Sequence, residues 1–168
     1  MINKRLAQLT RGALIAALYV VLTWLANQLG LANGAIQLRF SEALTVLPAF
    51  STAAVPGLTL GCLLSNLLMG VSVWDILFGT LATLLGAIGT HLLRRHLYLA
   101  ALPPILANTL IIPPVLRLAY GLPEGLPYLM LTVGIGELLS CGILGTMLAY
   151  ALRPRARRIF PGSIHPIV

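Results

Sequence analysis

The chain has 168 residues, of which 58% are hydrophobic and 9% charged, and its mean hydropathy is +0.95. This composition excludes an ordinary soluble globular protein and indicates an integral membrane protein of about one domain's length. The formal net charge of +7 would suggest nucleic-acid binding in a soluble protein, but the basic residues gather at the chain ends and in one loop, as topology signals do. We therefore expect no nucleic-acid partner.

The first apolar run, residues 12–31, has about the 20 residues that a helix needs to cross the hydrocarbon core. It follows Lys4, Arg5 and Arg11, which predicts a cytoplasmic N-terminus. A basic start before an apolar run also resembles a signal peptide, but this run is too long and lacks a convincing cleavage site. We therefore interpret it as a spanning helix.

This first helix carries small residues three and four positions apart, namely Gly12, Ala13, Ala16 and Ala17. Such residues allow another helix to approach closely. Two interpretations stay open at this point. The small residues pack within the same bundle, or they dock onto a partner subunit.

Three less regular apolar segments follow, at residues 36–50, 53–69 and 73–93. The first is short and charged, so hydropathy alone is also compatible with a surface or re-entrant segment. Arg94 and Arg95 are expected in the cytoplasm, and the chain must cross the membrane an odd number of times to bring them there from the outside. We therefore predict that all three segments cross.

Residues 97–120 contain Pro103-Pro104 and Pro113-Pro114, which interrupt helical hydrogen bonding and predict a kinked helix beside the binding space. Residues 127–152 then return the chain to an arginine-rich end. The sequence thus predicts an all-α integral membrane protein with six transmembrane helices, both termini cytoplasmic, and a single domain over residues 1–168 with a short basic cytoplasmic tail from about residue 153. In this arrangement nine of the eleven basic residues lie inside: Lys4, Arg5, Arg11, Arg94, Arg95, Arg153, Arg155, Arg157 and Arg158.

Motifs of common enzymes are absent from the sequence. There is no phosphate-binding loop ending in Lys-Ser or Lys-Thr, no HExxH, no GxSxG, and no acidic cluster suited to catalytic metals. Cys62 and Cys141 lie in apolar runs, where a free cysteine behaves as a small hydrophobic residue. We expect no enzyme, no cofactor, no metal and no disulfide.

Arg39 and Glu42 stand three apart, so on a helix they share a face. A charge at lipid depth costs about 2.5 to 3.5 kcal/mol on insertion scales, which makes such residues candidates for function. Arg39 has two interpretations: it extends to the interface or neutralises Glu42, or it contacts a ligand directly.

Glu137 lies ten residues beyond Pro127, about 15 Å along a helix axis and so near the bilayer centre. It either bonds a neighbouring helix as a protonated carboxyl group or serves a ligand, and we favour the ligand. Asp75 either caps a helix start or joins the site, and Asn66 lies near the same outer loop.

The run QLRFSEALTVLPAFSTAAVPGLTLGCLLSNLLMG, followed by DILFGTLATLLGA, resembles the QueT family. These are substrate-binding membrane subunits (S components) of energy-coupling-factor (ECF) transporters that import queuosine precursors. The resemblance extends from the first helix to GELL in the last one. It implies a protein of the prokaryotic plasma membrane that works with a transmembrane scaffold subunit and two cytoplasmic ATPase subunits. In this class small residues of the first helix contact the scaffold, and here Ala13 and Ala17 match.

The ligands that the resemblance implies are 7-aminomethyl- or 7-cyano-7-deazaguanine. A carboxylate can accept two parallel hydrogen bonds from the N1–H and 2-amino edge of such a ring, and a second acid can pair with an aminomethyl ammonium group. The acids expected to do so are Glu42 and Glu137. The supporting groups are Arg39, Asn66 and Asp75, with Trp74 as a stacking surface or as part of an aromatic belt.

Two other functions remain open on the sequence. One is a secondary carrier for a nucleobase-like or cationic solute, coupled to protons through Glu137. The other is a membrane assembly protein without a small ligand.

Overall fold

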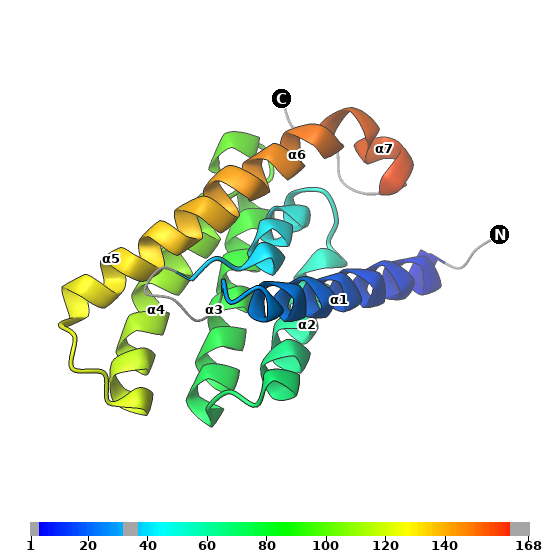
Figure 1. Cartoon of the computed structure of the whole chain (residues 1–168). Coiled ribbons are helices and arrows are strands. Elements are labelled where there is room, and N and C mark those ends of the chain that lie inside the picture. Colours follow the sequence, from blue (N-terminus) through cyan, green and yellow to red (C-terminus); the bar gives the residue numbers. More distant parts are fainter. Residues whose placement is uncertain (1–3, 32–36, 162–168) are drawn as a thin grey trace.

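The computed structural model describes residues 4–31 and 37–161, and the regular structure in these ranges is helical (Figure 1). The elements in chain order are α1 (Lys4–Gln28), η1 (Phe40–Ala49), α2 (Ala54–Met69), α3 (Val73–Leu92), η2 (Leu97–Leu99), α4 (Leu102–Tyr120), α5 (Leu126–Glu137), η3 (Leu138–Gly145), α6 (Thr146–Leu152), η4 (Arg153–Arg155) and α7 (Ala156–Ile159). Each of the six predicted segments corresponds to helical structure. Four helical stretches are long and apolar enough to cross a membrane: Lys4–Gln28, Val73–Leu92, Leu97–Tyr120 and Leu126–Arg155.

The long helices turn large apolar side chains outward and small ones inward. Exposed leucines line α1, α2, α3 and α4, whereas the buried positions of α2 and α3 are mostly alanine, glycine, threonine and serine. A soluble protein has the opposite arrangement, because its leucines form the core. Small interior residues let membrane helices pack closely while the leucines face lipid.

Close contact between α1 and α2 depends on glycine. A Cβ atom added to Gly57 would lie 2.7 Å from the backbone oxygen of Gly12, and one added to Gly61 would lie 2.7 Å from Cβ of Tyr19. The small residues Gly12 and Ala16 therefore pack inside the bundle, as one of the two interpretations predicted. Ala13 and Ala17 lie on the exposed side of α1.

The second predicted segment is the ten-residue 3₁₀ helix η1, in the centre of the bundle (Figure 1, cyan). At about 2 Å per residue it covers about 20 Å, less than the roughly 30 Å hydrocarbon core. Eight of its ten residues are buried. It contacts η3, where Gly145 leaves room for Val46.

The first and last described helices share one end of the bundle, which we call the terminal end. There Arg11 Nη2 donates to the Pro161 carbonyl at 3.2 Å, the rings of Phe50 and Phe160 stack at 6.1 Å, and His91 Nδ1 lies 2.9 Å from the Pro48 carbonyl oxygen. The chain has thus returned to the terminal end where η1 finishes, as a full crossing would bring it. The helices that follow therefore start from the end of the bundle that the sequence predicted.

The segment after Glu137 is a π-helix, η3, which continues directly into α6. Short π-helical stretches within α-helices occur often at functional sites. Here the stretch begins immediately after the buried acid Glu137 and contains Ser140 and Cys141, both buried.

Candidate functional site

A polar cavity of about 360 Å³ opens at the end of the bundle opposite the terminal end, which we call the cavity end. Its volume falls in the range of small-molecule sites, about 300 to 1,000 Å³. It lies among the last turns of α1, α2 and α4, the first turns of α3, and the extended segment before η1. The lining residues are Thr23, Ala26, Asn27, Gln37, Arg39, Asn66, Met69, Val71, Asp75, Gly79, Ile112, Leu116, Tyr120 and Leu122.

A small recess of about 10 Å³ adjoins this cavity, because both are lined by Gln37, Arg39 and Ile112. The recess adds Asn108, Val133 and Glu137. Asn108 is only 4% exposed, and its Nδ2 has no hydrogen-bond partner among the described residues. The buried amide lies close to the Glu137 carboxylate without completing a hydrogen bond, so it can pair with that carboxylate after a small movement or with a ligand acceptor.

Arg39 is held where cavity and recess meet. Its backbone N–H donates to Ser140 Oγ at 3.1 Å, and its guanidinium donates to Gln37 Oε1 at 3.3 Å. The backbone of Gln37 lies against α5 so closely that a Cβ on Gly136 would meet its carbonyl oxygen at 2.3 Å. The guanidinium thus lines the cavity, and its side-chain hydrogen bond goes to the neutral Gln37 and not to Glu42.

Glu42 is 2% exposed and lines neither the cavity nor the recess. Its Oε1 accepts a short hydrogen bond from the Tyr19 hydroxyl, and its Oε2 has no partner within the described part of the chain. The neighbouring Ser41 accepts from Thr23 Oγ1 at 2.8 Å, so α1 holds the start of η1 at two points. Glu42 therefore lies behind the recess instead of in its wall.

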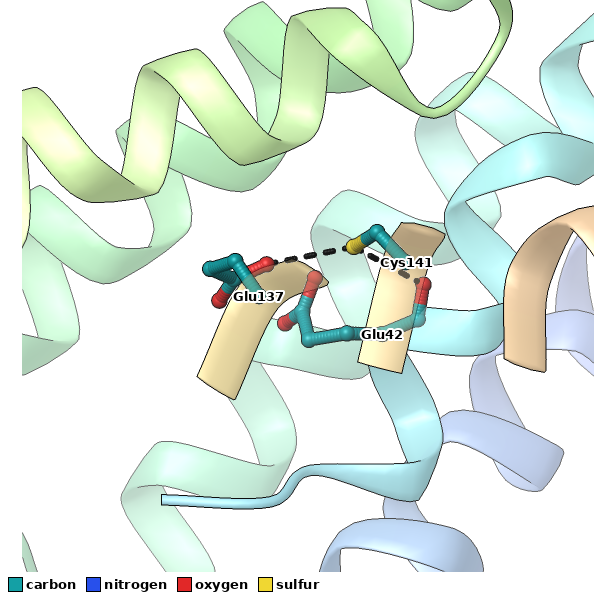
Figure 2. Close-up of side chains that lie close together, drawn as sticks. All are labelled: Glu42, Glu137 and Cys141. Atoms are coloured by element: carbon teal, nitrogen blue, oxygen red, sulfur yellow. Dashed lines mark hydrogen bonds between the residues drawn. The ribbon is translucent and has the colours of Figure 1, made fainter. Parts of the chain in front are cut away.

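Figure 2 shows the carboxylates of Glu42 and Glu137 facing each other beside the Cys141 thiol. Cys141 Sγ donates to Glu137 Oε2 at 3.1 Å and approaches the Glu42 carbonyl oxygen at 3.4 Å. One carboxylate oxygen from each acid and the sulfur lie within 4.8 Å of one another, so these three residues could hold a metal ion. Thr45 Oγ1 also contacts the sulfur, at 3.3 Å. Two carboxylates this close repel when both are charged, and N–H donors from a ligand would relieve the repulsion.

Asp75 lies in the first turn of α3, but it is not the N-cap. Ser72 is the cap, since its Oγ accepts from the Asp75 backbone N–H at 3.3 Å, which corrects the capping interpretation of Asp75. The Asp75 carboxylate accepts from Ser72 Oγ at 3.4 Å and, through a short bond to Oδ2, from the Tyr120 hydroxyl. The Asp75 side chain is thereby positioned at the cavity by neutral donors.

The two remaining predicted ligand residues lie in different places. Asn66 lines the cavity and donates from Nδ2 to the Asp75 carbonyl oxygen at 3.3 Å, a bond that joins α2 to α3. Trp74 is 57% exposed, stacks on Phe78 and lines a separate apolar groove of about 480 Å³ between α3 and α4. The structure thus brings Arg39, Asn66 and Asp75 together at the cavity, with Glu137 in the recess, and leaves Trp74 outside.

The sequence analysis did not identify Tyr19, Gln37, Asn27 or Tyr120 as residues of the site. Tyr19 shares a face of α1 with Ile15 and Ala26, and this spacing does not distinguish a hydrogen-bonding tyrosine from a packing residue. Only the folded chain brings Tyr19 to Glu42, Tyr120 to Asp75 and Gln37 to the recess that holds Glu137.

Comparisons with known proteins give one consistent result. The model of the QueT transporter family matches residues 9–154. The chain is also 39% identical over 72 residues to the queuosine precursor transporter QueT of Lactococcus lactis subsp. cremoris, an alignment that spans 43% of this chain and 42% of that protein. No solved structure matches the chain. The match to a transporter family, together with the long apolar helices, identifies a multi-pass plasma membrane protein that is not an enzyme. Because the family model matches most of its length, the chain belongs to the QueT transporter family.

Proposed function

We propose that this protein is the substrate-binding subunit of an ECF importer and captures a queuosine precursor, 7-aminomethyl- or 7-cyano-7-deazaguanine, from outside the cell. The observation that carries the proposal is the polar cavity among apolar helices, which narrows to a recess with Glu137 and an unpartnered Asn108 amide. A flat heterocycle with donors and acceptors along its edge is the kind of ligand that such a cavity suits.

The proposed orientation places the terminal end in the cytoplasm and the cavity end outside. The terminal end carries Arg94 and Arg95 after α3 and the arginines that follow α6, in keeping with the excess of basic residues in cytoplasmic segments. The cavity then faces the medium from which the ligand arrives. In this proposal the chain crosses six times, with η1 and its extended approach serving as one crossing.

The proposed partners are a transmembrane scaffold subunit and two cytoplasmic ATPase subunits. The chain itself has no phosphate-binding loop, so energy from ATP must come from another subunit. Ala13 and Ala17 offer a surface on which a scaffold helix could approach closely, since both are exposed on the side of α1 that faces away from α2.

Reconstitution in liposomes tests the proposal. With the scaffold and ATPase subunits present, labelled 7-deazaguanine should accumulate only when ATP is enclosed with the ATPases. The protein alone should bind the ligand without accumulating it. Accumulation by the protein alone under a proton gradient would contradict the proposal and favour the proton-coupled carrier, for which the buried pair of Glu42 and Glu137 is the supporting observation.

A thermal-shift screen separates both transporters from an assembly protein. A ligand that binds only the native state raises stability in proportion to RT ln(1 + [L]/Kd). We expect a rise in melting temperature with 7-deazaguanines and none with adenine. A flat response across the panel would favour the assembly role.

A further inference from the structure

The charged groups around the cavity and the recess follow a definite order. Glu137 lines only the recess, Arg39 lines both recess and cavity, and Asp75 lines only the cavity. Among the described lining residues these three are the charged ones. From the deep end outward, the site therefore presents an acceptor, then a donor, then an acceptor.

One edge of 7-aminomethyl-7-deazaguanine carries groups in the complementary order. The 2-amino and N1–H donors come first, the O6 acceptor follows, and the aminomethyl ammonium on C7 lies next to O6. A carboxylate suits the first pair, a guanidinium suits O6, and a second carboxylate suits the ammonium. The cyano analogue matches the first two positions, but its nitrile is an acceptor and would meet the second carboxylate as a repulsive partner.

Asp75 is suited to this last position because its charge is held in place without being neutralised. Its carboxylate accepts from the hydroxyl groups of Tyr120 and Ser72, both neutral. It lies in the first turn of α3, where the helix dipole favours a negative charge. A half-buried carboxylate with neutral donors around it leaves a cationic ligand group as the natural counter-charge.

We infer that Asp75 selects the cationic aminomethyl ligand over the neutral cyano ligand, while Arg39 binds O6 and Glu137 receives the N1–H and 2-amino edge at the opening of the recess, whose volume of about 10 Å³ is that of one water-sized group. Tyr120 is a positioning residue that fixes the Asp75 carboxylate. This inference rests on the proposed function, and it gives Glu42 an indirect part: Glu42 supports the recess from behind, next to Glu137.

Dissociation constants of both ligands for the purified protein and for Asp75→Asn test the inference. The wild type should bind the aminomethyl ligand more tightly than the cyano ligand. Loss of one charge-assisted bond should weaken aminomethyl binding about tenfold to a hundredfold in Asp75→Asn and leave cyano binding within about threefold. Retained cyano binding shows at the same time that the variant is folded. Tyr120→Phe should lower the same preference by a smaller factor.

Two further variants complete the comparison. Glu137→Gln should weaken both ligands alike, because both share the N1–H and 2-amino edge. Glu124→Gln removes an exposed acid from the loop between α4 and α5, and it should change neither constant. If both ligands bind the wild type but Asp75→Asn weakens them equally or leaves both unchanged, the inference is wrong and the proposed function stands. If neither ligand binds the wild type, the proposed function and the inference both fail.

Discussion

Glu42 has one carboxylate oxygen bonded to Tyr19 and the other without a partner among the described residues. Tyr19→Phe removes the hydroxyl that donates to this buried carboxylate. We expect a loss of about 1 to 3 kcal/mol in unfolding free energy, because an unpaired buried acceptor carries its full desolvation penalty. Thermal unfolding in detergent measures the change, and Tyr150→Phe, at an exposed tyrosine of α6, is the matched control. Equal melting temperatures for the two variants would contradict this account of Glu42.

The two buried acids can also be compared through ligand binding. Glu42→Gln and Glu137→Gln should each weaken 7-deazaguanine binding, the second by about tenfold or more, because an amide supplies one acceptor where a carboxylate supplies two. Glu42 should have the smaller effect, since it lies behind the recess. Isothermal titration with Glu124→Gln as control provides the measurement. Equal affinity in all three variants would place the pocket elsewhere.

At the scale of elements, the contact between α1 and α2 leaves no room for a methyl group at Gly61. Gly61→Ala should destabilise the protein by about 1 to 3 kcal/mol, the usual range for overpacking. Gly134→Ala in α5 is the control, because a Cβ there would meet its nearest neighbour, on Thr109, at an ordinary 3.5 Å. There the gain in helix propensity, up to about 1 kcal/mol, should make the change neutral or stabilising. Similar melting temperatures would mean that α1 and α2 can separate without cost.

The sequence predicted the helical elements well and their lengths less well. Long apolar runs identify α1, α3, α4 and the α5 to α6 stretch, because crossing lipid demands about 20 apolar residues. The short segment at residues 36–50 was expected to cross the membrane, and the structure forms a ten-residue 3₁₀ helix, η1, within it. Hydropathy measures how apolar a segment is, whereas η1 is buried by protein, so tertiary packing determined its conformation.

The polar site was predicted in part for a similar reason. Residues that are costly in lipid stand out in any sequence, and Arg39 and Asp75 at the cavity and Glu137 in the recess were found in this way. Tyr120 resembles an interfacial aromatic residue until the end of α4 brings it to Asp75. Trp74 neighbours Asp75 in sequence, but successive residues of a helix point about 100° apart, so it lines the apolar groove instead.

At the scale of the whole molecule, the proposed orientation predicts which residues a membrane-impermeant maleimide can reach. The native Cys62 and Cys141 are free and buried, so neither should react in the folded protein. Glu124→Cys should be labelled on intact cells, and Arg95→Cys only after the membrane is permeabilised. The reverse pattern would invert the orientation, and labelling of both on intact cells would rule out the single crossing by α4 that the proposal places between Arg95 and Glu124.

Assembly and ligand capture should be separable functions of different faces. Ala13→Trp or Ala17→Trp adds bulk on the exposed side of α1, and neither residue lines the cavity. We expect unchanged ligand affinity but loss of co-purifying scaffold and of ATP-driven uptake. Leu85→Trp, on an exposed position of α3, is the control and should preserve all three. Normal uptake by both alanine variants would contradict docking at this face.

The π-helical stretch Leu138–Gly145 is a place where this chain could lose one residue without turning the helix that follows. A π-helix holds one residue more in each hydrogen-bonded ring than an α-helix does. Deleting a single exposed residue there, such as Ile143, would let regular α-helix form and would leave α6 in nearly the same orientation relative to Glu137. Gly145 could then still face Val46, but the narrower turn would move Ser140 and Cys141 relative to their hydrogen-bond partners. A one-residue gap at this place in an otherwise similar chain would therefore mark a protein with a differently shaped recess, even with every charged residue retained.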